Sequence, residues 1–163
     1  HYVCKYTPIE LFAGFGETCA VLEEMPENFE MSDQIAHANL CGFGKSVIQA
    51  VLQGKADELV MVNCCDSMRR VYDIVASTGK CKFLYMLDLP HDDNECEKEK
   101  FAAAIRRLKE AYEKYSGKTF DKAAFPFFRE TSHRDETIYR RSRRACQRCP
   151  GRHDPGKHPD GCG

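Results

Sequence analysis

Two short apolar runs, separated by a segment of helix length, constrain the fold of this chain more than any other feature. Residues 58–64 (ELVMVNC) and 81–89 (CKFLYMLDL) have strand length and are apolar almost throughout, which is typical of strands buried on both faces. Residues 66–78 between them carry apolar side chains at helical spacing. Strands that alternate with helices indicate βαβ units, so the sequence predicts an α/β fold with a parallel, doubly wound sheet.

Further helices and strands are expected on either side of this unit. Thr7 and Pro8 suit the N-cap and the first position of a helix. Residues 34–52 are predicted to be helical with an interruption near residues 42–44, and the polar residues 23–33 are predicted to be irregular. The other expected elements are a helix at 9–15, a strand at 18–22, a long helix at 95–115 and the start of a helix at 119–125.

The chain has ten cysteines in 163 residues, a high content for a sequence without signs of secretion. A disulfide framework is typical of secreted proteins, and the first residues lack the basic and apolar segments of a signal peptide. No stretch approaches the roughly 18 apolar residues of a membrane span. The remaining roles for these cysteines are metal ligation and burial as apolar thiols.

Two of the cysteines lie where a predicted helix begins. Cys41 stands beside two glycines in NLCGFGK, and Cys65 follows the first apolar run directly before Asp66. A helix N-terminus lowers the pKa of a thiol and favours an anionic site. Thiols from two neighbouring strand–helix junctions can hold a soft metal or an iron–sulfur cluster. The alternative is a pair of buried thiols at helix caps, and the pattern by itself leaves both interpretations open.

The order of these motifs resembles the 2-hydroxyacyl-CoA dehydratase / benzoyl-CoA reductase family, and within it the D-component-like subunits. The resemblance covers roughly residues 6–125 and rests on YTPIELFAGFG, AHANLCGFGKSVIQAVLQGKADELVMVNCCDSMRRVYDIV and KFLYMLDLPH. It implies a flavodoxin/Rossmann-like parallel sheet with flanking helices. It also implies that residues 1–125 are an incomplete α/β domain, an N-terminal-half fragment of a two-domain parent.

The resemblance further implies a [4Fe-4S] cluster held by three cysteines. Two of them correspond to Cys41 and Cys65 in this sequence, and the third lies downstream of the matching residues. We choose Cys65 over Cys64 because the family pattern has the ligand directly before Asp, and because Cys64 reads as the last residue of a buried strand. Asp66 is then expected to be the N-cap of the next helix. The pair Arg69–Arg70 suits either coenzyme A phosphates or a solvated helix face.

The implied function is that of an iron–sulfur subunit of a 2-hydroxyacyl-CoA dehydratase, a lyase of the anaerobic cytoplasm. Such an enzyme removes water from a 2-hydroxyacyl-CoA by a radical reaction and yields an enoyl-CoA. Its implied partners are the acyl-CoA thioester substrate, a homologous second dehydratase subunit and an ATP-hydrolysing iron–sulfur activator protein. Two alternatives stay open: an ATP-dependent reductase of benzoyl-CoA or double-cubane-cluster type, and a non-catalytic α/β fragment without a cluster. No residue is assigned to catalysis or to substrate binding.

Residues 126–163 differ from the rest of the chain. They hold nine of the 24 Lys and Arg residues, five of the 25 Asp and Glu residues, and no apolar period. Their CxxC pair suggests a zinc site and their arginines a nucleic-acid arm. A third interpretation is a shift of reading frame, because the same bases read one position over can encode a strand, a glycine turn and a helix start. We expect an irregular, disordered, out-of-frame tail, without a nucleic-acid or membrane partner. The cysteines without an evolved role are then Cys146, Cys149 and Cys162.

Overall fold

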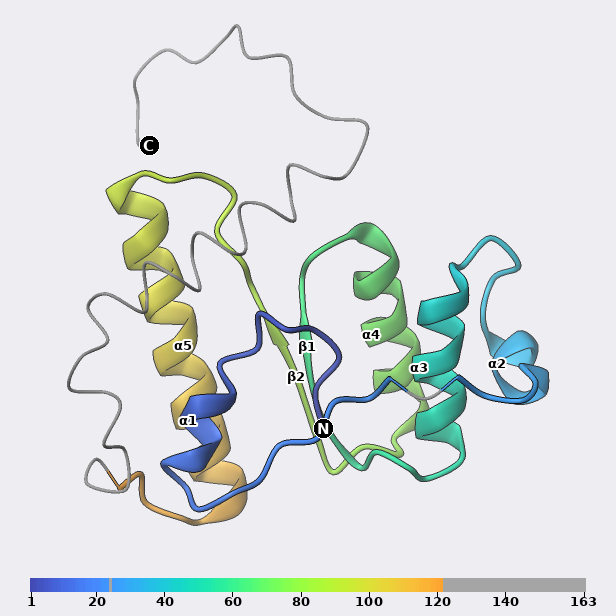
Figure 1. The fold of residues 1–163 in the computed structure, drawn as a ribbon, viewed down its shortest axis with the longest axis horizontal. Helices are drawn as coiled ribbons and strands as arrows, with labels where there is room; N and C mark the ends of the chain where they lie inside the picture. Colours follow the sequence, from blue (N-terminus) through green and yellow to red (C-terminus); the bar gives the residue numbers. More distant parts are fainter. Residues whose placement is uncertain (24, 122–163) are drawn as a thin grey trace, which may run out of the picture.

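Two parallel strands form the centre of the fold. The computed structural model describes residues 1–23 and 25–121, and in it β1 (Glu58–Val62) pairs in parallel with β2 (Phe83–Leu87), with Glu58 opposite Phe83. The helix α4 (Asp66–Thr78) connects the two strands (Figure 1). Parallel strands joined by a helix confirm the predicted α/β fold.

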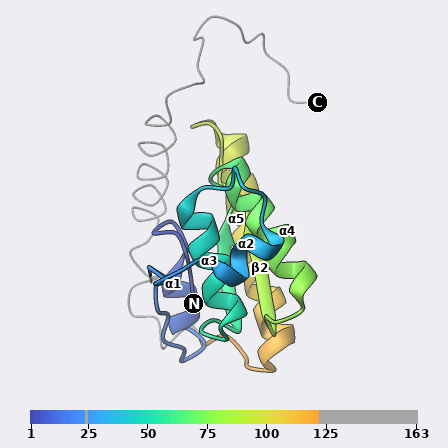
Figure 2. The ribbon, with the colours of Figure 1, turned by 90° about the vertical axis from the view of Figure 1, so that its right-hand side faces the viewer.

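Helices cover both faces of this strand pair. α3 (Gly42–Leu52) and α4 pack on one face, and α1 (Ile9–Ala13) and α5 (Glu95–Ser116) pack on the other (Figure 1). The short helix α2 (Glu30–Ile35) packs against α3, and the view in Figure 2 shows α2, α3 and α4 together on one flank. The described residues therefore form three layers of helix, strand and helix.

The first residues of the chain extend the sheet beside β1. Tyr2 makes one parallel bridge to Val60 and another to Val21. The amide of Val60 donates a hydrogen bond to the carbonyl of His1 at 3.0 Å. The N-terminal segment thus runs alongside β1 in the same direction and leads directly into the turn that contains Cys4.

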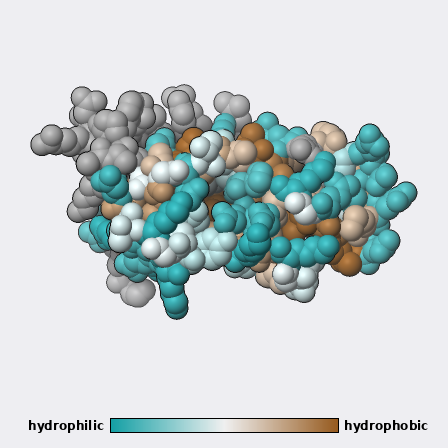
Figure 3. Space-filling model, turned by 90° about the horizontal axis from the view of Figure 1, so that it is seen from below, coloured by the Kyte–Doolittle hydropathy of each residue, from teal (hydrophilic) through white to brown (hydrophobic). Residues whose placement is uncertain are grey.

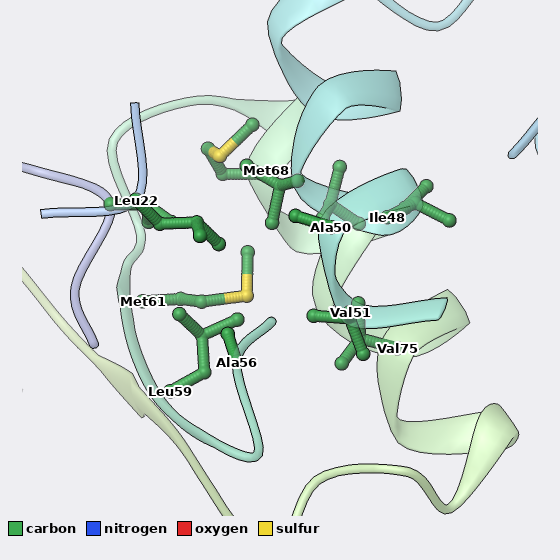
Figure 4. Packing of buried hydrophobic residues seen from close by; sticks show 12 residues of the cluster. Leu22, Ile48, Ala50, Val51, Ala56, Leu59, Met61, Met68 and Val75 are labelled. Atoms are coloured by element: carbon green, nitrogen blue, oxygen red, sulfur yellow. The ribbon is translucent and has the colours of Figure 1, made fainter. Parts of the chain in front are cut away.

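β1 contributes side chains to two separate cores. Leu59 and Met61 belong to the core with α3 and α4, whereas Val60 and Val62 belong to the core with α1 and α5. This division follows from the alternation of side chains along a strand. Figure 4 shows the first core, in which Met61 extends from the strand toward the helices. The second core is rich in aromatic rings that meet edge to face, namely Phe12, Phe15, Phe83 and Tyr112.

β2 is less buried than the sequence predicts. The apolar run at residues 81–89 indicates a strand covered on both faces, but Leu84, Tyr85 and Met86 are half-buried. Within the described part of the chain, β2 pairs with β1 alone. It is therefore an edge strand here, and its middle side chains have neighbours on fewer sides.

The predicted helix at residues 34–52 is divided into two helices. α2 begins at Glu30, inside the segment expected to be irregular, and α3 begins at Gly42. The buried side chain of Gln49 on α3 accepts a hydrogen bond from the backbone amide of Ser32 on α2 at 2.9 Å. This tertiary contact holds α2 against α3, and the extended backbone of Cys41 separates the two helices.

The expected helix cap at Thr7 is also wrong. α1 begins at Ile9 with Pro8 in the N-cap position, and the hydroxyl of Thr7 is buried without a hydrogen-bond partner among the described residues. The predicted strand at 18–22 is reduced to the single bridge of Val21. The long helix is confirmed as α5, and the expected helix start at 119–125 lies mostly outside the described residues.

Apolar side chains are exposed on the flank formed by α2 and α3. Seen from below, hydrophilic surface covers most of the described part of the molecule, and apolar surface appears in separate patches (Figure 3). The large exposed apolar side chains include Met25, Met31, Ile35 and Phe43. Among the described residues, no helix combines the length and the apolar character needed to cross a membrane.

Candidate functional site

Cys41 lies at the N-terminus of α3. It occupies the N-cap position with extended backbone angles of φ −63° and ψ 151°. Its thiol sulfur accepts a hydrogen bond from the backbone amide of Gly44 at 3.4 Å, and the residue is exposed to solvent. An exposed sulfur at the N-terminus of a helix is accessible to a metal ion.

Gly44 allows α3 to lie close to α4 at this point. A Cβ atom at position 44 would lie 2.9 Å from Cγ2 of Val71, 3.2 Å from Cγ of Leu40 and 3.4 Å from the sulfur of Cys41. A Cβ at Gly42 would meet nothing within 4 Å. The second glycine of the NLCGFGK motif is therefore needed for packing, and the first is not.

Cys65 lies at the N-terminus of α4. It is the N-cap of that helix, in an extended conformation, and its thiol makes no capping hydrogen bond. Its carbonyl accepts hydrogen bonds from the amides of Met68 at 3.1 Å and Arg69 at 3.3 Å. The expectation that Asp66 is the N-cap is wrong by one residue, because Asp66 is already the first residue of the helix. Its carboxylate lies in the first turn, where its negative charge interacts favourably with the positive end of the helix dipole.

Cys64 lies outside the strand in which the sequence predicts it. It was expected to end a buried strand, but β1 ends at Val62 and Cys64 is exposed. Its amide donates to the carbonyl of Val62 at 2.8 Å, so the backbone turns away from the sheet at this residue. Burial thus gives no reason to prefer Cys65 over Cys64 as a ligand. The remaining argument is the position of Cys65 before Asp66.

Cys4, which belongs to no motif of the sequence, lies beside Cys64. The two thiols share a side-chain hydrogen bond. Because of this bond, aided by the amide of Tyr6 and the charge of Lys5, the pKa of Cys4 is lowered to about 7, although burial opposes the shift. The same hydrogen bond, together with burial, raises the pKa of Cys64. Of the two, Cys4 is therefore the thiol that ionises first.

The candidate metal ligands Cys41 and Cys65 stand at the same end of neighbouring helices. α3 and α4 pack against each other, and both begin near the carboxyl end of β1 (Figure 1). Two exposed thiols at helix N-termini are a chemically suitable pair of donors for iron or another soft metal. Within residues 1–23 and 25–121, however, no group of three or more His, Cys, Asp and Glu side chains is arranged to hold a metal ion. The described residues thus supply two candidate ligands and no complete site.

A polar network joins the carboxyl ends of the two strands. Asn63 donates through Nδ2 to Oδ1 of Asp88 at 3.1 Å and accepts through Oδ1 from Nε of Arg69 at 2.6 Å. Two hollows, of about 370 and 470 Å³, lie on either side, and both are lined in part by Asn63 and Asp88. In open α/β sheets this edge is where ligands gather.

The arginine pair at the start of α4 is engaged in surface interactions. Arg69 lies 3.8 Å from a carboxylate oxygen of Asp66, and Arg70 lies 3.9 Å from one of Asp73. Exposed pairs of this kind contribute little to stability. They agree with the interpretation of a solvated helix face, although the larger hollow is lined by both arginines.

Sequence patterns pointed to some of these residues and missed others. Cys41 and Cys65 stand in short motifs with glycine or aspartate neighbours, so they could be found. The contact between Cys4 and Cys64 spans sixty positions and has no spacing signal. The pairing of Asn63 with Asp88 follows only from their equivalent positions after two parallel strands. The predicted tail at 126–163, with Cys146 and Cys149, lies outside the described residues.

The chain matches the model of a known protein family. The family model described as 2-hydroxyglutaryl-CoA dehydratase, D-component, matches residues 4–151. This span includes every cysteine discussed above from Cys4 to Cys65, and it runs on past residue 125. No curated protein matches the chain.

Proposed function

The chain belongs to the 2-hydroxyglutaryl-CoA dehydratase D-component family, and on this basis we propose that it is an iron–sulfur subunit of a 2-hydroxyacyl-CoA dehydratase. The observation that supports the proposal is the position of two thiols. Cys41 and Cys65 are the N-caps of two helices that pack together, and both are exposed. Membership of the family makes the chain a dehydratase component, and the positions of the two thiols support the proposal of a cluster.

We assign to Cys41 and Cys65 the role of cluster ligands. Each of these residues is the N-cap of a helix, where the positive end of the helix dipole suits an anionic cluster. Gly44 keeps α3 close to α4 and leaves room for the sulfur of Cys41. When bound, a cluster of this kind supplies a one-electron relay for reduction of a CoA thioester. The chain's own contribution is to hold two sulfurs on rigid helix ends.

The partners in this proposal are a homologous second subunit and an ATP-hydrolysing activator protein, with a 2-hydroxyacyl-CoA as substrate. The surface next to Cys41 supports a protein partner. Met31, Ile35 and Phe43, on α2 and the first turn of α3, have 38%, 46% and 43% of their surface exposed. Exposed apolar side chains on two helices that pack together suit a surface that another protein covers. We propose that the second subunit covers them.

The test is metal content under exclusion of oxygen. The full chain is reconstituted with iron and sulfide, and its iron, its sulfide and its visible spectrum are measured. The same measurements are made on Cys41→Ala, Cys65→Ala and the control Cys81→Ala. Cys81 is a suitable control because it precedes β2, at the opposite end of the strands, where its thiol donates to the carbonyl of Ala56 at 3.6 Å.

We expect iron and a visible absorption band in the wild type and in Cys81→Ala, and loss of most of the iron in the other two variants. Iron that survives both Cys41→Ala and Cys65→Ala would disprove the ligand assignment. A wild-type chain that takes up no iron, alone or with its partner subunit, would favour the alternative of an α/β chain without a cluster.

A further inference from the structure

Two cysteines that the proposed cluster does not use are in contact at the carboxyl end of β1. Cys4 and Cys64 share a side-chain hydrogen bond, and both are free thiols in the structure. Cys64 is exposed and Cys4 is half-buried. A small oxidant in solution can therefore reach the pair from the side of Cys64.

The backbone keeps the two thiols together. The segment before Cys4 runs parallel to β1 through the bridge between Tyr2 and Val60. Both chains then turn: the amide of Thr7 donates to the carbonyl of Cys4 at 2.9 Å, and that of Cys64 donates to Val62 at 2.8 Å. The bridge thus links the two segments, and a backbone hydrogen bond holds each segment in its own turn.

The neighbouring thiol of Cys65 is a poorer partner for Cys64. Consecutive Cα atoms lie about 3.8 Å apart across a trans peptide, whereas the Cα atoms of a disulfide usually lie about 4.4–6.8 Å apart. A bond between Cys64 and Cys65 would therefore distort the chain at the start of α4. Cys4 comes from a different segment and is free of this constraint.

We propose that Cys4 and Cys64 are an oxidation site, at which a peroxide converts the two thiols into a disulfide. The reaction leaves Cys65 unmodified. It joins the N-terminal segment covalently to the residue that precedes the proposed cluster ligand. The proposal goes beyond the cluster assignment and does not depend on it, because neither Cys4 nor Cys64 is a proposed ligand.

The chemistry needs hydrogen peroxide as the only co-reactant. The sulfur of Cys4 attacks one peroxide oxygen, the O–O bond breaks, and the leaving hydroxide takes up the thiol proton as water. This step leaves a sulfenic acid on Cys4. The sulfur of Cys64 then attacks the sulfur of Cys4, the S–S bond forms, and the sulfenic hydroxyl leaves as water with the proton of Cys64. Two thiols lose two electrons, and one peroxide becomes two waters.

The test maps the disulfide in the full chain. Protein purified without oxygen is treated with stoichiometric hydrogen peroxide, alkylated, denatured and digested with trypsin without reduction. Trypsin releases Cys4 within residues 1–5 and Cys64 within residues 56–69. We expect mass spectrometry to find these two peptides joined, with a loss of two titratable thiols per chain, and to find them separate after treatment with dithiothreitol.

Cysteine variants show whether the disulfide of Cys4 forms with Cys64 or with Cys65. The cross-link is expected to persist in Cys65→Ser and in the control Cys19→Ser, and to be absent from Cys4→Ser and Cys64→Ser. A cross-link that persists in Cys64→Ser would overturn the proposal, as would a wild-type peptide 56–69 with an internal disulfide. Recovery of fully alkylated Cys4 after peroxide treatment would overturn it as well. The wild-type mapping needs no variant, so misfolding of a variant cannot hide the result.

Discussion

The close packing of α3 against α4 depends on the absence of a side chain at Gly44. We predict that Gly44→Ala lowers the free energy of unfolding by about 1–3 kcal/mol, because the new methyl group overlaps Val71 at 2.9 Å. The matched control is Gly42→Ala, which faces open space and should leave stability unchanged or raise it by up to about 1 kcal/mol. Urea unfolding of the three chains measures both values. Equal stability of the two variants would contradict the role of Gly44 in packing.

The lowered pKa of Cys4 predicts a pH-dependent reactivity. The thiolate is the form that reacts with iodoacetamide, and it is present above the pKa of about 7 and lost as the pH falls below it. We predict that alkylation of Cys4 reaches half its maximal rate near pH 7, and that Cys64→Ala shifts this midpoint upward by removing the hydrogen bond. Cys81, whose pKa is raised by burial, is the internal control. Equal rates at Cys4 and Cys81 at pH 7 would contradict the prediction.

Single residues could be predicted from sequence where their role is local. The positions of Cys41 and Cys65 at helix starts could be predicted from their glycine and aspartate neighbours. Their role as cluster ligands comes from the family resemblance and stays a prediction. Cys64 was placed in the strand because its apolar neighbours continue to Val62, and nothing in the sequence shows that the backbone turns at Asn63. The contact between Cys64 and Cys4 could not be predicted, since it depends on how the N-terminal segment docks against β1.

At the scale of elements, the side-chain cap of the long helix α5 contributes to the stability of the fold. The side chain of Asn94 accepts a hydrogen bond from the amide of Glu97 at 2.8 Å. We predict that Asn94→Ala lowers the free energy of unfolding by about 1 kcal/mol, because the first turn of α5 loses its only side-chain cap from the N-cap position. Glu99→Ala, on the exposed surface of the same helix, is the control with an expected change below about 0.5 kcal/mol. Denaturant unfolding compares the two, and an equal loss in both would argue against the cap.

Helices and strands with a strong apolar period could be predicted, and those held by tertiary contacts could not. α4, α5, β1 and β2 follow from the sequence pattern, with bounds that differ by a few residues. The division between α2 and α3 depends on Gln49, whose buried amide oxygen binds the backbone of Ser32. A glutamine in an apolar helix gives no sign of such a partner, so a single interrupted helix was predicted in place of two.

At the scale of the whole molecule, β1 belongs to both cores. The parallel pairing and the three layers could be predicted because the apolar run of β1 leaves no polar face for solvent. The sequence does not predict which of the two cores holds the aromatic side chains and which holds the aliphatic ones. The ring pairs Phe12–Tyr112, Phe83–Tyr112 and Phe83–Tyr115 lie on the side of α1 and α5, and the buried side chains on the side of α3 and α4 are mainly aliphatic. Tyrosine signals therefore report mainly on the side of α1 and α5, apart from that of Tyr72, which packs against the aliphatic core.

The shared strand predicts that the two cores unfold together. Met61 is fully buried on the aliphatic side, so Met61→Ala should lower the free energy of unfolding by about 2–5 kcal/mol. Tyr112 and its aromatic neighbours lie on the other side of β1. In a Tyr72→Phe background, which removes the tyrosine packed against the aliphatic core, we predict that the near-ultraviolet signal of the tyrosines shifts to the same lower midpoint as the helical signal. The reason is that β1 needs both cores to stay folded. Met25→Ala, at a side chain 80% exposed, should shift neither signal. A tyrosine signal that keeps the wild-type midpoint in Met61→Ala would show that the two faces unfold independently.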